Sequence, residues 1–260
     1  LADGTAFGGT AEGEPLYRYY GYVVDHIIET QEQADNAMYD SSAKGYRPSD
    51  GKNIAGRKEI GDYEWKNREG SQTKDGKDYI DSQDQFLLGY TVPHSTGGLN
   101  NNFTYKNFTL NIFVDWALGH SINNNSEMRY FMNTFANNYT LIDEVKQCWK
   151  QPGDNTKYAR FTANDPDDGN ANFSRTSNVF NYKGDYLCIR EISLQYNVPT
   201  NKLTKLGIQN LAITLAGNNL HYFTAVKGVS PEVGASTTYN KDYYNYPPIR
   251  KYSVGVKVTF

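Results

Sequence analysis

The residues that most often carry enzymatic chemistry are scattered in this sequence of 260 residues. No G-x-S-x-G elbow and no phosphate-binding P-loop occurs. The histidines lie in or beside polar segments without an ordered nucleophile partner, and they are His26, His94, His120 and His221. The expected role of each is that of a solvated loop residue. We therefore expect that the chain is not an enzyme.

One pair of carboxylates keeps a hydrolytic interpretation open. Glycoside hydrolysis needs two carboxyl groups that project from the scaffold into one cleft. Asp115 and Glu191 are the acidic residues on the polar faces of the strands predicted below. A β-rich glycan hydrolase built on this pair is therefore a third interpretation, behind the two that follow from the strand pattern.

An acidic segment, residues 73–84, has part of the spacing of a calcium-binding loop. Carboxylates stand at three of the ligand positions, namely Asp75, Asp81 and Asp84. Thr73 and Lys77 replace carboxylates at two others, and Asp78 replaces the glycine of the turn. Because a lysine cation opposes metal binding, a solvated acidic loop is favoured. No cofactor is expected, and Ca²⁺ in this loop is the weaker alternative.

A group of tyrosines and asparagines before the last predicted strand is the best candidate for substrate contact. Aromatic rings can stack on sugar faces or peptide side chains, and amides can orient the ligand through hydrogen bonds. The group consists of Tyr239, Tyr243, Tyr244, Tyr246, Asn240 and Asn245. A girdle of aromatic side chains at a membrane surface, or a local loop core, would have the same composition. Both alternatives stay open.

Composition narrows the class of protein that could hold these residues. The chain has 22 Tyr and 12 Phe, and its formal net charge of −3 gives no support for a nucleic-acid partner. Mean hydropathy is −0.71, and no apolar run of 18 residues occurs, which excludes a helical membrane protein. The two cysteines, Cys148 and Cys188, are expected to be unpaired structural residues. A soluble extracellular β-protein or a transmembrane β-barrel remains.

Apolar and polar residues alternate with a period of two in several segments, which predicts β-strands. The clearest is the last, where five residues share one face: Tyr252, Val254, Val256, Val258 and Phe260. The strands are predicted at about residues 13–25, 97–105, 108–119, 186–198, 208–222 and 248–260. In the fourth strand, Tyr186, Cys188, Ile192 and Leu194 are expected on one apolar face. Arg190 interrupts that face, which is tolerable only near a membrane surface or in water.

Strand length and connection length both favour a membrane barrel. The predicted strands reach about a dozen residues, whereas a bilayer needs about 9–11 and ordinary strands have about 5–6. Short connections at residues 106–107 and 199–207 alternate with long ones at 26–96, 120–185 and 223–246. Outer-membrane barrels show this asymmetry, with short periplasmic turns and long extracellular loops. Since bacterial barrels have at least about eight strands, the chain is expected to be part of a larger barrel.

Five stretches in order resemble the C-terminal part of SusC-like TonB-dependent outer-membrane transporters. They are GEPLYRYYGYVVDHII (13–28), FTYKNFTLNIFVDWALG (103–119), CWKQPGDNTKYAR (148–160), YLCIREISLQYNVP (186–199) and GIQNLAITLAGNNLHYFT (207–224). The resemblance implies that residues 1–260 belong to a 22-stranded antiparallel barrel whose N-terminal plug and TonB box are absent from this chain. The apolar row that ends at Phe260 resembles the assembly signal of outer-membrane barrels, whose regular last strand can pair in one register with another sheet edge.

The resemblance also implies a function. It predicts active import of glycans or oligopeptides across the outer membrane of a Gram-negative, Bacteroidetes-like cell. The expected partners are a SusD-like surface lipoprotein, TonB-ExbB-ExbD acting through the missing plug, the rest of the same barrel and the oligosaccharide or oligopeptide cargo. The alternative is a soluble, secreted carbohydrate-binding β-protein, which would share the alternating strands and the high tyrosine content.

Overall fold

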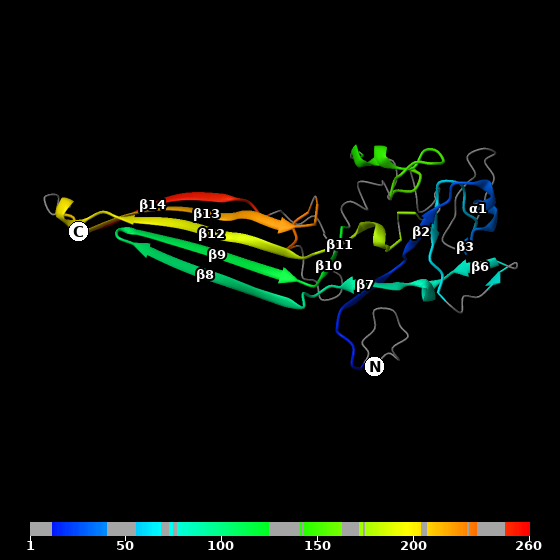
Figure 1. Ribbon diagram of the computed structural model, residues 1–260, viewed down its shortest axis with the longest axis horizontal. Coiled ribbons are helices and arrows are strands. Elements are labelled where there is room, and N and C mark those ends of the chain that lie inside the picture. The colour runs from blue at the N-terminus through cyan, green and yellow to red at the C-terminus, as the bar shows by residue number, and fades with distance from the viewer. Residues whose placement is uncertain are drawn as a thin grey trace. The chain divides into compact units, whose positions relative to one another are not determined.

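A computed structural model describes the greater part of the chain (Figure 1). The described residues are 12–40, 56–68, 73–74, 77–124, 141, 143–162, 172–173, 175–203, 207–227, 229–232 and 248–260. Two compact units are present. The sheet unit comprises Val92–His120, Lys183–Val233 and Asn245–Phe260, and the aromatic unit comprises the other segments. In the described part of the chain, no helix is long and apolar enough to cross a bilayer.

The sheet unit is built on a five-stranded antiparallel sheet with the strand order β14-β13-β12-β9-β8. Its strands are β8 (Ser95–Tyr105), β9 (Phe108–Leu118), β12 (Tyr186–Asn197), β13 (Asn210–Thr224) and β14 (Lys251–Thr259). Figure 1 shows these long strands side by side. The predicted all-β, antiparallel class is confirmed. Among the described strands, β8 and β14 form the edges of this sheet.

A two-residue turn joins β8 to β9 and sets their register. Tyr105 stands opposite Phe108, so that only Lys106 and Asn107 lie between the strands. Lys106 adopts a left-handed conformation with φ +53°, which such tight hairpin turns require. The backbone carbonyl of Asn107 also accepts a hydrogen bond from the Asn197 amide at 2.8 Å, which ties the turn to the end of β12.

A β-bulge at Arg190 divides β12 into two stretches of opposite phase. On the pairing with β9, Ile189 stands opposite Val114 and Glu191 opposite Phe113, so that Arg190 is an extra residue. An extra residue reverses which face the side chains beyond it occupy. Leu187 and Ile189 therefore share the face of Ile192 and Leu194.

The bulge corrects one sequence prediction. Tyr186 and Cys188 were expected on the apolar face with Ile192 and Leu194, and this is wrong. Cys188 pairs with Asp115 of β9 and so lies on the polar face. The alternation of apolar and polar residues along one strand cannot reveal a bulge, because a bulge is defined by how that strand pairs with its neighbour.

The segment predicted as one strand at residues 13–25 also differs in the structure. It forms two short strands, β1 (Arg18–Gly21) and β2 (Val24–Ile27), which pair with β7 (Phe86–Tyr90) and β4 (Tyr63–Trp65). Between them, Tyr22 forms an isolated bridge with Ser177. The chain thus changes partners at Tyr22, and the segment belongs to the aromatic unit. The sheet strands, by contrast, begin and end within a few residues of the predicted bounds.

The aromatic unit consists of short elements. The further strands are β3 (Tyr39–Asp40), β5 (Thr73–Lys74), β6 (Lys77–Ile80), β10 (Ser121–Asn123) and β11 (Asn181–Lys183). The helices are α1 (Gln31–Asn36) and the 3₁₀ turns η1 (Ser82–Asp84), η3 (Asp143–Gln147) and η4 (Asn178–Phe180), with η5 (Thr200–Lys202) in the sheet unit. Helix α1 begins with a capping box between Thr30 and Gln33, which satisfies free backbone amides of its first turn.

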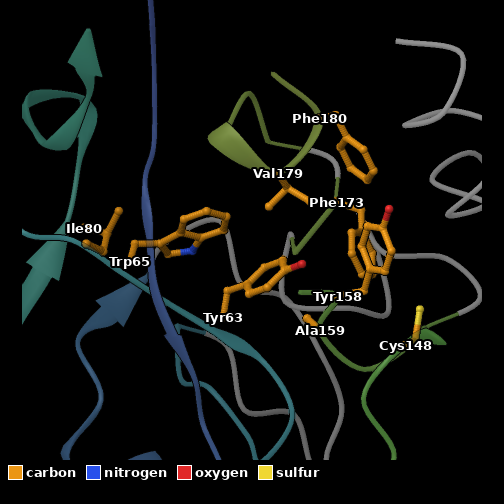
Figure 2. Close-up of a cluster of buried hydrophobic side chains, with 9 residues drawn as sticks. All are labelled: Tyr63, Trp65, Ile80, Cys148, Tyr158, Ala159, Phe173, Val179 and Phe180. Carbon is orange, nitrogen blue, oxygen red and sulfur yellow. The ribbon is translucent and has the colours of Figure 1, made fainter. Parts of the chain in front are cut away.

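Buried rings from distant segments form the core of the aromatic unit (Figure 2). The core residues are Tyr63, Trp65, Ile80, Cys148, Tyr158, Ala159, Phe173, Val179 and Phe180. Tyr63 packs 5.4 Å from Trp65 and 5.8 Å from Phe173, the latter edge-to-face. Such ring pairs stabilise a core beyond simple burial. Both cysteines are buried and form no disulfide within the described part of the chain, Cys148 in this core and Cys188 in β12.

Removal of the central ring of this core should unfold the aromatic unit locally. Phe173 is fully buried, and we expect Phe173→Ala to cost about 3–5 kcal/mol because it leaves a cavity between Tyr63 and Phe180. Limited proteolysis of the folded protein measures the effect. Leu87→Ala, at a largely exposed position of β7, is the control and should leave the cleavage rate unchanged. Equal rates in both variants would contradict the role given to this core.

Candidate functional site

One face of the five-stranded sheet is apolar across all its strands. In one row of register partners, Phe103, Leu110, Leu194, Leu215 and Val254 stand next to one another. Leu194 is 38% exposed, Leu215 51% and Val254 73%. A continuous exposed surface of large apolar side chains is unfavourable in water and marks a contact surface. This face is therefore the first candidate for a functional surface.

Aromatic rings lie at both ends of the apolar face. At the turn end, where residues 106–107 join β8 to β9, the rings of Phe108 and Tyr196 are 4.7 Å apart. At the opposite end, Trp116, Leu187 and Phe223 form one row. The apolar face is thus bounded along the strands by aromatic side chains.

The opposite face of the sheet carries uncharged hydrogen-bonding groups near the turn end. The Asn111 amide donates to the Oδ1 atoms of Asn100 and Asn102, at 2.7 and 3.0 Å. The hydroxyls of Thr104 and Thr109 are 3.4 Å apart. These groups can also bind water or a polar ligand, so this face suits an aqueous space.

Farther from the turn end, the polar face holds a cluster of charges around Arg190. The guanidinium donates to both carboxylate oxygens of Asp115, from Nε at 3.1 Å and from Nη2 at 2.6 Å. Its Nη1 donates to Asn219 Oδ1 at 2.9 Å and to the Tyr222 hydroxyl at 3.2 Å. Its Nη2 also forms an ion pair with Glu232. One cation thus binds groups from β9, β13 and the connection that follows β13.

Asp115 and Glu191, the carboxylates considered for hydrolysis, have separate partners. Asp115 forms the ion pair with Arg190, and Glu191 accepts a hydrogen bond from Asn218 at 3.1 Å. Both carboxylate oxygens of Asp115 are bonded to Arg190, and an oxygen of Glu191 is bonded to Asn218, so both carboxyl groups are engaged by neighbouring side chains of the sheet. The pair is therefore better explained as part of the polar wall than as a catalytic dyad.

His120 lies at the end of the sheet away from the turn. Its backbone carbonyl accepts from the Gly184 amide at 2.8 Å, and the adjacent Gly119 amide donates to Asp185 Oδ1 at 2.6 Å. Burial lowers the pKa of the imidazole below its ordinary value of 6.5, while a hydrogen bond to the Pro231 backbone and the charge of Asp185 act in the opposite direction. His120 is therefore held neutral at pH 7 and packs against the connection after β13.

The residues predicted as an assembly signal lie on and after the edge strand β14. Tyr252, Val254 and Val256 stand opposite Gly217, Leu215 and Ile213 of β13. Val258 continues the same row, and Phe260 is 79% exposed beyond the end of the strand. The other side of β14 faces no strand of this sheet. The row and its free edge are thus arranged as an edge-pairing strand requires.

The predicted substrate residues lie outside the described residues. They are Tyr239, Tyr243, Tyr244, Tyr246, Asn240 and Asn245. Their connection is described only at its two ends, residues 225–227 and 229–232 after β13 and residues 248–250 before β14. Substrate contact by these side chains therefore stays a prediction.

The acidic segment considered for calcium contains a capped turn. Asp81 Oδ1 accepts from the Gln83 amide at 2.6 Å, and Asp84 accepts from the amides of Asp81 and Arg68 at 2.8 and 2.9 Å. These carboxylates thus stabilise η1 and the preceding chain. Asp75 lies outside the described residues. Among those described, no group of three or more His, Cys, Asp or Glu residues is placed to hold a metal ion.

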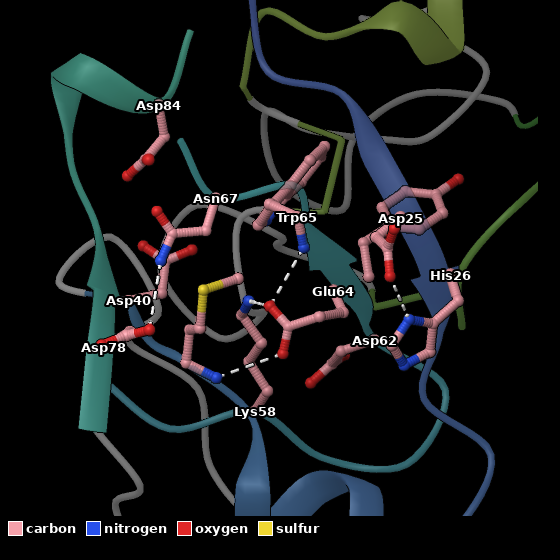
Figure 3. Close-up of polar contacts among 12 residues, drawn as sticks. Asp25, His26, Asp40, Lys58, Asp62, Glu64, Trp65, Asn67, Asp78 and Asp84 are labelled. Atoms are coloured by element: carbon pink, nitrogen blue, oxygen red, sulfur yellow. Dashed lines mark hydrogen bonds and ion pairs between the residues drawn. The ribbon is translucent and has the colours of Figure 1, made fainter. Parts of the chain in front are cut away.

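Buried charges beside β4 were not identified from the sequence (Figure 3). Lys58 Nζ lies 2.5 Å from Glu64 Oε1, and Glu64 also accepts from the backbone amides of Met38 and Trp65.

Arg160 forms an ion pair with Asp62 at 2.6 Å. In a third pair, Arg175 Nη2 lies 2.8 Å from Asp40 Oδ1. Such pairs leave no local pattern, because Asp62 and Arg160 are 98 positions apart. The Arg175 guanidinium also lies over the rings of Tyr22 and Trp65, at 4.4 and 5.2 Å from their centroids, which connects one pair to the aromatic core.

Comparisons with known proteins agree with this arrangement. No family model matches the sequence. Similar proteins are TonB-dependent receptor P3 of Formosa agariphila, 28% identical over 194 residues, and TonB-dependent receptor P39 of the same organism, 27% identical over 200 residues. These alignments cover 72% and 73% of this chain and 18% of each relative. The chain thus spans about a fifth of the length of the curated relatives it matches.

Solved structures share the fold. The RagAB peptide transporter matches 94% of this chain and 23% of its own with a TM-score of 0.60 at 18% identity. The RagAB peptide importer in its closed-closed state has a TM-score of 0.58 at 17% identity, with the same coverage. The resemblance to TonB-dependent receptors predicted from the sequence motifs is confirmed.

The pH dependence of stability should report the burial of His120. Since its folded pKa lies below 6.5, the unfolded chain binds more protons as the pH falls through 6.5, and stability is lost. The loss amounts to about 1.4 kcal/mol for each pH unit between 6.5 and the folded pKa. The denaturation midpoint should therefore fall more steeply toward pH 5 in the wild-type protein than in His120→Gln. The other histidines are common to both proteins. Parallel curves would show that His120 does not titrate on unfolding.

Proposed function

Taking the chain as a relative of TonB-dependent receptors, we propose that it is the C-terminal part of an active importer in a bacterial outer membrane. The sheet unit forms part of the barrel wall, and the remaining strands come from the rest of the same protein. The turn at Lys106–Asn107 faces the periplasm, and the aromatic unit belongs to the extracellular loops.

The observation that supports this proposal most strongly is the exposed apolar face between two rows of aromatic rings. From Phe108 to Trp116 the strand rises about 27 Å at about 3.4 Å per residue, and a tilt of about 40° reduces this to about 20 Å. The apolar band of outer-membrane barrels is about 25 Å tall and is flanked by aromatic girdles. The polar face then lines the lumen.

The cargo and the partners follow from the family resemblance. We propose an oligomeric nutrient, a glycan or an oligopeptide, and the RagAB structures are those of a peptide transporter. A SusD-like lipoprotein would bind at the extracellular side. TonB-ExbB-ExbD would supply energy through a plug that precedes this segment. Uptake of labelled oligopeptides and oligosaccharides by cells that carry the full-length protein tests the cargo, and uptake of neither would contradict import.

The alternative, a soluble carbohydrate-binding protein, would expose the row of Leu215, Val254 and Phe103 to water. Burial of such side chains contributes about 1.5–3 kcal/mol each, so that a soluble protein has a strong reason to cover them. The requirement for detergent separates the two functions. The membrane protein should fractionate with outer membranes and need detergent to stay in solution.

Substitution on the two faces of β12 tests the membrane assignment. Leu194→Arg places a charge in the apolar band, where it should cost about 2–4 kcal/mol and lower the folded fraction. Ser193→Arg is the matched control, because Ser193 lies on the polar face opposite Asn111 and Ala216. Heat-modifiable migration on gels measures folding. Equal losses in the two variants would mean that the apolar face does not meet lipid.

Deletion of Phe260 tests the proposed assembly signal. Slippage by one residue would exchange the apolar row of β14 with Lys251, Ser253 and Lys257, so a fixed chain end favours correct pairing. The ring itself contributes at most about 1.5–3 kcal/mol to a large barrel. We therefore expect low outer-membrane levels but a nearly normal denaturation midpoint for the purified protein. Normal levels in cells would eliminate the assembly role.

A further inference from the structure

Two adjacent bulges distort the sheet at the edge of the Arg190 cluster. Ile189 pairs with His221 and Glu191 with Asn218, so that Arg190 is unpaired on β12 and two residues are unpaired on β13. One of these is Asn219, which has a left-handed conformation with φ +51°. Bulges re-aim side chains and are frequent at functional positions.

The bulge on β12 decides where the Arg190 side chain goes. Without it, the alternation through Leu194 and Ile192 would carry Arg190 to the apolar face. With it, the guanidinium binds Asp115 and Tyr222 on the polar face. A charge on the apolar face would be costly in lipid, so the bulge makes an arginine possible here.

The Arg190 cluster also binds both ends of the connection between β13 and β14. At the first end, Glu232 forms an ion pair with Arg190. At the second end, Asn219 Nδ2 donates to the Ile249 carbonyl at 3.2 Å, while Asn219 Oδ1 accepts from Arg190. Arg190 therefore contacts one end directly and the other through Asn219.

A second wall residue supports the first end. The imidazole of His120 is close enough to the Pro231 backbone, next to Glu232 in the chain, for that backbone to influence its pKa. Thr224, the last residue of β13, donates through its hydroxyl to the Asp185 carbonyl at 2.8 Å. The start of the connection therefore follows directly on a residue that is bonded to the chain just before β12.

We propose that Arg190 is a positioning residue that clasps both ends of the β13–β14 connection to the polar wall, through Glu232 on one side and Asn219 on the other. The clasp is separable from the fold. Asp115 keeps its bidentate bond to Arg190 when Glu232 is neutralised, so the wall retains its own charge pair. In the proposed importer, this clasp fixes the two described ends of the connection, at Glu232 and at Ile249.

Limited trypsin digestion of the full-length protein tests the clasp without reference to transport. Lys241 lies within the connection and provides a cleavage site. Glu232→Gln should accelerate cleavage there by about two- to fivefold, as expected for loss of a partly exposed ion pair. High salt should accelerate wild type and leave the variant nearly unchanged, because salt screens exposed charges.

Two further variants make the result specific. Glu191→Gln is the matched control, since Glu191 lies on the same face but bonds to Asn218. It should be cleaved like wild type. Arg190→Lys loses the planar fork that serves several acceptors at once, and should match or exceed the effect of Glu232→Gln. Combining it with Glu232→Gln should add little, because both changes break the same contact.

Cleavage of Glu232→Gln at the wild-type rate, with heat-modifiable migration intact, would overturn the proposal. Failure of Glu232→Gln to fold would also overturn it, because the contact between Arg190 and Glu232 would then be needed for folding of the sheet. A transport arm uses a fluorescein-labelled oligopeptide, for which the clasp variants should raise the half-saturation concentration more than they change the maximal rate. This arm rests on the proposed function. Absence of uptake in wild type would reject import of that peptide. The trypsin digestion would then test the clasp independently of transport.

Discussion

The register of the five-stranded sheet is the constraint on which the other features depend. Every strand alternates with a period of two, so that a shift by one residue would exchange the leucine row with serines, asparagines and lysines. The tight turn at residues 106–107 and the bond from Asn197 to Asn107 fix this register near one end. In the proposed barrel wall, backbone pairing would also satisfy the amides and carbonyls that lipid could not solvate. One pairing pattern therefore serves stability and the separation of the two faces.

The bulge at Arg190 shows how the sheet departs from this regularity where charges are needed. Near the turn, the polar face of β8 and β9 uses uncharged Asn and Thr groups, whereas the opposite end of the sheet concentrates Arg190, Asp115, Glu191 and Glu232. Charges near the end of a membrane strand cost less than charges at its middle. The extra residue lets the Arg190 side chain reach the polar face. Ile189 and Leu187, which precede it, stay on the apolar face opposite Val114 and Trp116.

Much of the sheet could be predicted from the sequence, because alternation is a local property. The strands of the sheet, the turn at residues 106–107 and the apolar row of β14 all follow from neighbouring residues. The aromatic unit could not be predicted in this way. Its core joins Tyr63 to Phe173, and its ion pairs join residues such as Asp40 and Arg175, which are 135 positions apart. The phase error at Cys188 has a related cause, since a bulge exists only in the pairing of two strands.

The order of segments along the chain gives the aromatic unit a mechanical role. The chain leaves this unit at Thr91, forms the hairpin of β8 and β9, and returns at Ser121. The two crossing points are joined inside the unit, where the Leu88 carbonyl accepts from the Ser121 hydroxyl at 3.5 Å and from the Asn181 amide at 3.1 Å. These two bonds close a loop that contains the whole hairpin. The conformational entropy of this loop is lost when the bonds at Leu88 form. If β8 later separates from β9, the two ends of the hairpin remain held together by these bonds. The bonds of Leu88 with Ser121 and Asn181 therefore constrain both ends of the hairpin. As long as they persist, the edge strand β8 can separate from β9 only within a closed loop.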